Sequence, residues 1–174
     1  MSTSDRGQRP RPTVVIGLGN PLMGDDGLGL AALAQLRDQW DVPGDVELVD
    51  GGTWGMNLLP VIEDAGRVLL LDAINAGAAP GTEVVIPRTR LPAYLAMKIS
   101  PHQVDMADVI ALAVLRGTLP DDTVAIGLQP SRVELSNELT DLLRCRLDDL
   151  VGTVVRQLES WGHDCVPKAI PVHA

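Results

Sequence analysis

Residues 67–72 read Arg-Val-Leu-Leu-Leu-Asp, a short and nearly continuous apolar run that ends in a carboxylate. A strand with this pattern is typical of the middle of a parallel sheet, where both faces of the strand are buried. Burial on both faces requires a covering layer on each side of the sheet. The run therefore predicts a three-layer α/β/α domain.

The remaining chain alternates between short β-branched or apolar runs and longer stretches with helical spacing of apolar residues. We predict strands at 13–16, 46–50, 67–72, 82–86 and 122–128. The short link before residue 82 favours an antiparallel direction for that strand, so the sheet is expected to be mostly parallel but mixed, with about five strands. Helices are predicted at about 26–40, 54–63, 100–116 and 137–161.

Two of these helices carry further signals. Ser100, Pro101 and Gln103 fit the N-cap, the first helical position and the third position of a capping box. In the last helix, apolar residues recur at intervals of three and four, which predicts a buried stripe. That stripe consists of Leu139, Leu142, Leu143, Leu147, Leu150 and Val154.

Composition limits the protein to a few classes. A length of 174 residues with 45% hydrophobic residues fits one domain, which we assign to residues 13–165. Residues 1–12 are polar and Pro-rich and read as a disordered leader, and residues 166–174 read as a C-terminal tail. The formal net charge of −9 and the scattered Lys and Arg residues argue against a nucleic-acid partner. A monomer is reasonable for this size.

The apolar runs are interrupted by Asp or Gly well short of the length that spans a membrane, so no membrane association is expected. The two cysteines, Cys145 and Cys165, fit no CxxC spacing and read as buried or surface thiols. Such thiols suit a reducing compartment, and we expect a cytoplasmic protein.

The loop after the first strand, Gly17-Leu-Gly-Asn-Pro-Leu-Met-Gly-Asp-Asp-Gly-Leu-Gly29, begins like a nucleotide-binding turn. The dinucleotide fingerprint needs a third Gly three positions after Gly19, where this chain has Leu22. Asp25 and Asp26 also stand where a pyrophosphate would meet the start of the helix. Asp50, at the end of the second strand, is the one feature that imitates a ribose-binding acid. A nucleotide-binding α/β module is therefore the weaker hypothesis.

Carboxylates follow two of the predicted parallel strands: Asp25 and Asp26 lie in the loop after the first strand, and Asp72 ends the strand at 67–72. Either Asp25 or Asp26 can be the helix N-cap, and we favour Asp25. Asp26 then remains without a capping role at the carboxyl edge of the sheet. Asp72 lies at the same edge, although a turn residue held by backbone amides is an equal interpretation.

His102 lies in the first turn of a predicted helix, where an imidazole stays neutral, as metal binding requires. A structural surface histidine is its alternative interpretation. One imidazole and two carboxylates suit a divalent ion such as zinc or nickel with open coordination positions. We call Asp26, Asp72 and His102 the predicted ligand set. His163 and His173 are alternatives, expected to be exposed in the polar tail.

Five blocks of the sequence, taken in order, resemble the [NiFe]-hydrogenase maturation endopeptidases over about residues 13–165. The blocks are Gly17-Leu-Gly19-Asn20, Asp25-Asp26-Gly27-x-Gly29, Asp50-Gly51-Gly52-Thr53, Asp72-Ala73 and Lys98-Ile99-Ser100-Pro101-His102-Gln103. The resemblance implies that Asp26, Asp72 and His102 are both metal-binding and catalytic. Some relatives have Glu at the position of Asp26.

The same resemblance implies an enzyme that removes a C-terminal extension from a hydrogenase large-subunit precursor after nickel insertion. Nickel is then supplied by the substrate, and zinc or cadmium is expected to substitute in vitro. Metal-assisted hydrolysis is the expected route. The general base is left open among Asp50, Asp25 and an indirect, supporting role for Asp72. A non-catalytic nickel-binding maturation chaperone is the alternative within the same assembly.

Overall fold

The computed structural model describes residues 10–52, 54–97 and 104–169. In this part of the chain, five strands form the main sheet, and two further two-residue strands form a small ribbon. The main strands are β1 (Thr13–Leu18), β3 (Val46–Gly52), β4 (Arg67–Ala73), β5 (Glu83–Pro87) and β6 (Asp122–Leu128). The ribbon pairs β2 (Trp40–Asp41) with β7 (Val166–Pro167).

The main sheet has the strand order β3-β1-β4-β6-β5. All neighbouring pairs are parallel except β5 with β6, which is antiparallel as the short link predicts. The central strand β4 pairs with β1 on one side and β6 on the other, and its residues 68–73 are buried. The sequence therefore located the central strand correctly, and all the predicted strands are present.

Within the described residues the helices are five α-helices and three short 3-10 turns. The α-helices are α1 (Leu28–Gln39), α2 (Leu59–Asp64), α3 (Leu91–Met97), α4 (Val104–Leu115) and α5 (Asp141–Ser160). The 3-10 turns are η1 (Gly24–Gly27), η2 (Gly55–Leu58) and η3 (Arg88–Arg90).

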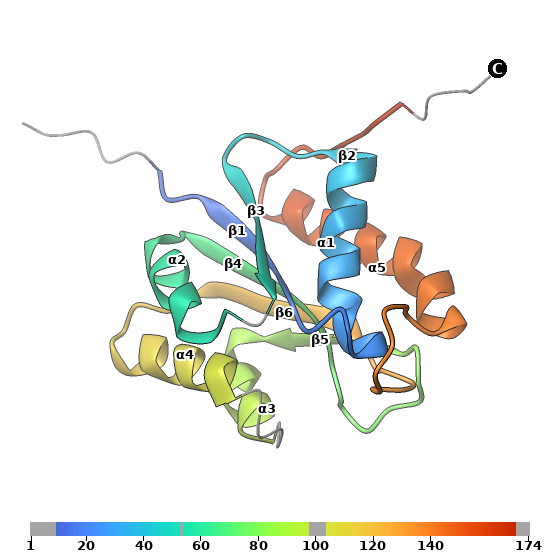
Figure 1. Cartoon of the computed structure of the whole chain (residues 1–174). Helices are drawn as coiled ribbons and strands as arrows, with labels where there is room; N and C mark the ends of the chain where they lie inside the picture. Colours follow the sequence, from blue (N-terminus) through green and yellow to red (C-terminus); the bar gives the residue numbers. More distant parts are fainter. Residues whose placement is uncertain (1–9, 53, 98–103, 170–174) are drawn as a thin grey trace, which may run out of the picture.

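Helices cover both faces of the sheet, which confirms the predicted three-layer α/β/α architecture (Figure 1). One core lies between the sheet and the α1/α5 layer and includes Leu33, Leu36 and Leu150. The other lies between the sheet and the α2/α3/α4 layer and includes Leu58, Ile62 and Ile110. No helix within the described residues is long and apolar enough to cross a membrane.

Several predicted helix boundaries were wrong. The first helix begins as the 3-10 turn η1, so α1 starts at Leu28 instead of Asp26. The last helix starts at Asp141 rather than at residue 137. No pattern in the sequence predicted α3, because the helix is short and Pro87 and Pro92 lie on either side of its start. The predicted cap of the helix at 100–116, which corresponds to α4, consists of residues 100–103 and lies outside the described residues.

The predicted stripe of the last helix is largely confirmed. Leu143, Leu147, Leu150 and Val154 are buried against the sheet, and Leu139 packs against the same core. Leu142 was assigned wrongly, because its side chain is 44% exposed at the start of α5.

Candidate functional site at the carboxyl edge of the sheet

The loop between β1 and α1 folds tightly over the carboxyl edge. Gly19 has φ = +111°, and a Cβ at this position would lie 1.8 Å from the carbonyl oxygen of Asp26, so a side chain is excluded there. The Asn20 side chain accepts a hydrogen bond from the backbone N–H of Leu22 at 2.9 Å, and the Asn20 backbone N–H donates to Asp26 Oδ2 at 2.9 Å. The turn thereby fixes the orientation of the half-buried Asp26 carboxylate.

Asp72 occupies the same edge from the neighbouring strand. It is the penultimate residue of β4, pairs with Gly127 of β6, and its side chain is 7% exposed. The turn η1, which contains Asp26, contacts β4. A Cβ on Gly29 would lie 2.2 Å from the carbonyl oxygen of Leu71, so only a glycine lets the start of α1 approach β4 this closely.

Asp25 does not cap α1, and the predicted capping role was wrong. The N-cap of α1 is Gly27, and the described residues provide no side-chain cap hydrogen bond there. Asp25 is instead 0% exposed and points into the 131–140 segment. Its Oδ2 accepts the N–H groups of Ser131 at 2.9 Å and Arg132 at 3.0 Å, and its Oδ1 accepts the N–H and hydroxyl of Thr140 at 2.8 and 2.9 Å.

Of the three histidines, only His163 lies within the described residues, and its environment differs from the predicted one. His102 and His173 lie outside the described residues. His163 was expected to be exposed, which is wrong: it is 6% exposed, and its Nε2 lies 2.8 Å from the Thr13 hydroxyl and its Nδ1 3.5 Å from an oxygen of Asp45. Thr13 begins β1 and His163 follows the end of α5, so the two residues meet at the edge of the sheet opposite Asp26. We therefore interpret His163 as a structural residue.

Gln129 was missed by sequence reasoning although it directly follows β6 at the same edge. Its side chain is 7% exposed. Its Oε1 accepts the N–H groups of Ala76 at 2.8 Å and Ala78 at 3.2 Å, and its Nε2 donates to the Asn75 side chain at 3.1 Å. Gln129 therefore shapes the loop that follows Asp72. A polar side chain immediately after an apolar strand was the available signal.

The edge offers carboxylate oxygens, a donor type that suits divalent cations. Asp26 and Asp72 come from adjacent parts of the edge, and Asp50 is exposed at the end of β3. Within the described residues no group of three or more His, Cys, Asp and Glu side chains is gathered closely enough to hold a metal ion. The third member of the predicted ligand set, His102, is not among those residues.

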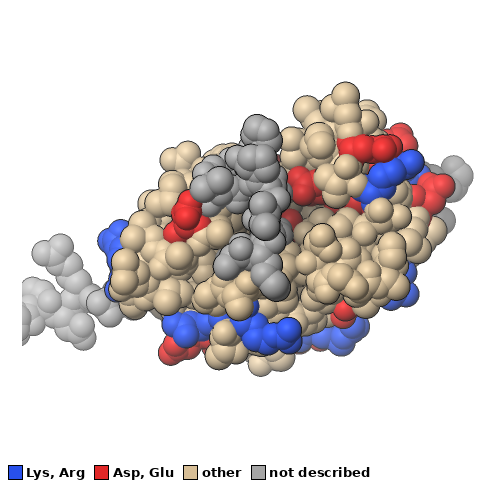
Figure 2. All heavy atoms as spheres, turned by 90° about the horizontal axis from the view of Figure 1, so that it is seen from below, with Lys and Arg blue, Asp and Glu red and all other residues tan. Residues whose placement is uncertain are grey.

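Acidic side chains lie on this side of the molecule next to a broad uncharged surface (Figure 2). Such a surface is unsuited to a nucleotide phosphate, because Asp25 and Asp26 both occupy the turn that would receive it. The geometry thus favours a cation or a protein ligand over a nucleotide.

Comparisons with known proteins agree on one family. Residues 30–157 match the family described as HycI, hydrogenase maturation protease. The chain is 36% identical over 156 residues to the hydrogenase expression/formation protein HupD of Rhodobacter capsulatus, covering 88% of this chain and 74% of HupD. It is 31% identical over 156 residues to the hydrogenase 2 maturation protease of Escherichia coli, covering 89% of this chain and 95% of the relative.

The fold is also similar to that of a solved family member. It matches the hydrogenase maturating endopeptidase HybD from E. coli with a TM-score of 0.86 and 30% identity, over 90% of this chain and 98% of that chain. The sequence, the family model and the fold thus indicate the same family over most of the chain. The chain belongs to the hydrogenase maturation proteases.

Proposed function

We propose that this endopeptidase removes a C-terminal extension from the large-subunit precursor of a [NiFe]-hydrogenase and recognises the nickel ion already bound in that precursor. Membership of the maturation protease family supports the processing of a hydrogenase precursor. The observation that carries the nickel part is the meeting of Asp26 and Asp72 at one sheet edge, each on an element held rigidly by the fold.

The two carboxylates differ in their surroundings, and the difference suits the recognition of a cation. Asp72 is buried in the sheet, whereas Asp26 is half-buried in a turn that fixes one of its oxygens. A cation brought by the substrate would be held between them, with His102 as the third ligand. Nickel in such a position would polarise the scissile carbonyl or lower the pKa of a bound water.

The structure of the loop limits which carboxylate can act as the general base. Asp25 is fully buried and engaged by three backbone N–H groups and a hydroxyl, so it is not placed to take a proton from water. Asp50 is exposed at the carboxyl end of β3. We therefore assign the base role to Asp50, because Asp72 is already placed at the cation, and a structural role to Asp25.

Mass spectrometry of the nickel-loaded precursor after incubation with enzyme tests the proposal. Asp26→Asn and Asp72→Asn should each reduce peptide release below detection, since each removes one negative charge from the nickel contact. Asp121→Asn is the matched control, because this carboxylate is fully exposed before β6 at the opposite edge. Cleavage by both edge variants at the wild-type rate would contradict the nickel-recognition site.

The same assay separates the alternatives. A maturation chaperone would bind the nickel-loaded precursor without releasing a peptide, and a nucleotide-binding module would gain thermal stability from added nucleotides. We further propose that the protein is a monomer, which size-exclusion chromatography tests, and that it acts in the cytoplasm, which cell fractionation tests.

A further inference from the structure

Two leucines protrude next to the turn that holds Asp26. Leu22 is 59% exposed and Leu135 is 84% exposed. Their backbones are joined, since the N–H of Ser136 donates to the carbonyl of Leu22 at 3.0 Å and the N–H of Gly24 donates to the carbonyl of Ser136 at 2.8 Å. Met23 and Ser136 form a parallel bridge, so Leu22 and Leu135 stand one register step away from it, side by side.

The segment that carries Leu135 is held in place although it contains neither helix nor strand. Residues 129–140 connect β6 to α5, and loops of this length are often functional. The buried carboxylate of Asp25 fastens both ends of residues 131–140 through Ser131, Arg132 and Thr140. A surface fixed in advance loses little conformational entropy when a partner binds, which favours affinity.

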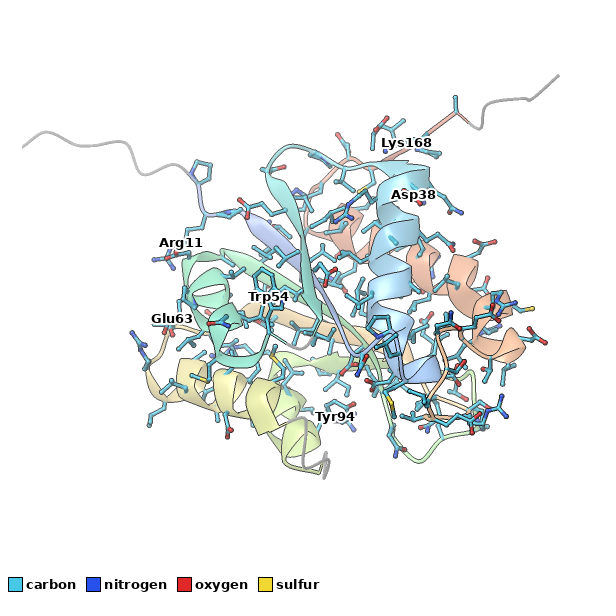
Figure 3. All side chains as sticks on the ribbon, in the orientation of Figure 1. Arg11, Asp38, Trp54, Glu63, Tyr94 and Lys168 are labelled. Atoms are coloured by element: carbon cyan, nitrogen blue, oxygen red, sulfur yellow. The ribbon has the colours of Figure 1, made fainter. Side chains whose placement is uncertain are left out.

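Exposed apolar side chains also border the other side of the edge. Trp54 is 57% exposed and Met56 is 45% exposed, both in or next to η2. Figure 3 shows Trp54 beside α2, and Tyr94 of α3, which is buried, lies in the same layer opposite α1 and α5. The candidate site thus has exposed apolar side chains on two sides, one set from the loops that precede α1 and α5 and the other from η2 and the residue before it.

We propose that Leu22, Leu135 and the neighbouring Val133, which is 52% exposed, form a docking surface for the folded body of the hydrogenase precursor. The inference rests on the proposed function. Leu22 precedes Asp26 by four residues, and a stable protein interface covers about 800 Å² of each partner. A folded precursor whose chain end reaches Asp26 therefore also covers Leu22 and Leu135.

The partner recognised here is a protein with a complementary apolar patch. Leu and Val side chains of this kind lose contact with water on docking, and that loss supplies binding free energy. The salt bridge Arg132–Glu134, at 3.1 Å, lies within the loop, and Glu138 of the loop pairs with Arg144 of α5 at 3.4 Å. The surface is consequently apolar with an internally paired charged rim.

Steady-state cleavage of the nickel-loaded precursor from the same organism tests this surface. The double variant Leu22→Ser/Leu135→Ser should raise KM about tenfold and leave kcat near the wild-type value, because the contacts act in binding and lie outside the reacting groups. Leu115→Ser is the matched control: Leu115 is also 84% exposed but ends α4 at the opposite edge of the sheet. Its KM should equal that of the wild type.

Binding of the precursor to Asp26→Asn enzyme, with and without the two serine substitutions, separates this proposal from the proposed function. Loss of binding only with the serine substitutions supports the docking surface. Equal KM values for the double variant and Leu115→Ser overturn it, even when nickel-dependent cleavage is established. Absence of any precursor binding or cleavage by the wild-type enzyme overturns both proposals, and normal cleavage by Asp26→Asn overturns the nickel site alone.

Discussion

Replacing Asp25 with alanine should destabilise the protein more than any other single carboxylate substitution at this edge. Asp25 is 0% exposed, and its two oxygens accept hydrogen bonds from three backbone N–H groups and from the Thr140 hydroxyl. Hydrogen bonds to a charged group contribute about 1.5–3 kcal/mol each. Ser131 and Arg132 are exposed, however, so water can reach part of the abandoned N–H groups.

We therefore expect a loss of about 3 kcal/mol from the free energy of unfolding, well below the sum of the individual bonds. For a chain of this size each kcal/mol lowers the melting temperature by roughly 2–4 °C, which gives a decrease of about 6–12 °C. Thermal melts followed by circular dichroism, with urea titrations at 25 °C as the second measurement, provide the assay.

Two variants control the experiment. Thr140→Ala removes only the hydroxyl donor and keeps the backbone N–H bond to Asp25, so it should cost about 1 kcal/mol. Asp121→Ala removes a fully exposed carboxylate and should leave the melting temperature unchanged. A melting temperature of Asp25→Ala within about two degrees of the wild-type value would show that this carboxylate does not hold the loop.

Three further outcomes are expected. A crystal soaked in zinc, cadmium or nickel should show the ion at the predicted ligand set, and anomalous density at His163 alone would refute that assignment. His163→Ala should lower the free energy of unfolding by about 2 kcal/mol, because a buried ring bonded to Thr13 is lost; an unchanged urea midpoint would refute this. Iodoacetamide should label Cys145 much faster than Cys165, since burial, followed by Glu159 and Asp164, raises the pKa of the Cys165 thiol. The folded state then keeps the Cys165 proton to a higher pH than the unfolded chain does, so the contribution of this thiol to the free energy of unfolding falls as the pH rises above its ordinary pKa. Equal labelling rates of the two cysteines would contradict the burial of Cys165.

Local patterns predicted the sheet because its central strands are buried on both faces. β6 was predicted with its observed bounds, and β4 was predicted one residue short. Continuous apolar runs between Asp or Gly residues leave few alternatives, so local sequence and tertiary structure agree there. α3 was missed because a short helix bracketed by prolines has too few residues to establish a periodicity.

The roles of Asp25 and His163 could not be predicted because their partners are distant in sequence. Asp25 bonds Ser131 and Thr140, which are 106 and 115 residues away. His163 lies 150 residues from Thr13. A polar residue in a Gly-rich or polar segment reads as a cap or as exposed, and only the folded chain brings its partners near. The edge positions of Asp26 and Asp72 were predictable, because strand order alone places them together.

The adjacent acids Asp25 and Asp26 show how one turn can provide both rigidity and an accessible charge. A buried carboxylate is costly unless donors compensate for the lost water. Asp25 meets that condition through four donors from the 131–140 segment, and the same bonds fix the turn that presents Asp26. Asp26 is only half-buried, so it keeps access to a ligand approaching the edge. Exchange of the two environments would remove both properties at once, because an exposed Asp25 would release the loop and a buried Asp26 would no longer be open to a ligand at the edge. Substitutions at Asp25 and Asp26 should therefore separate stability from activity.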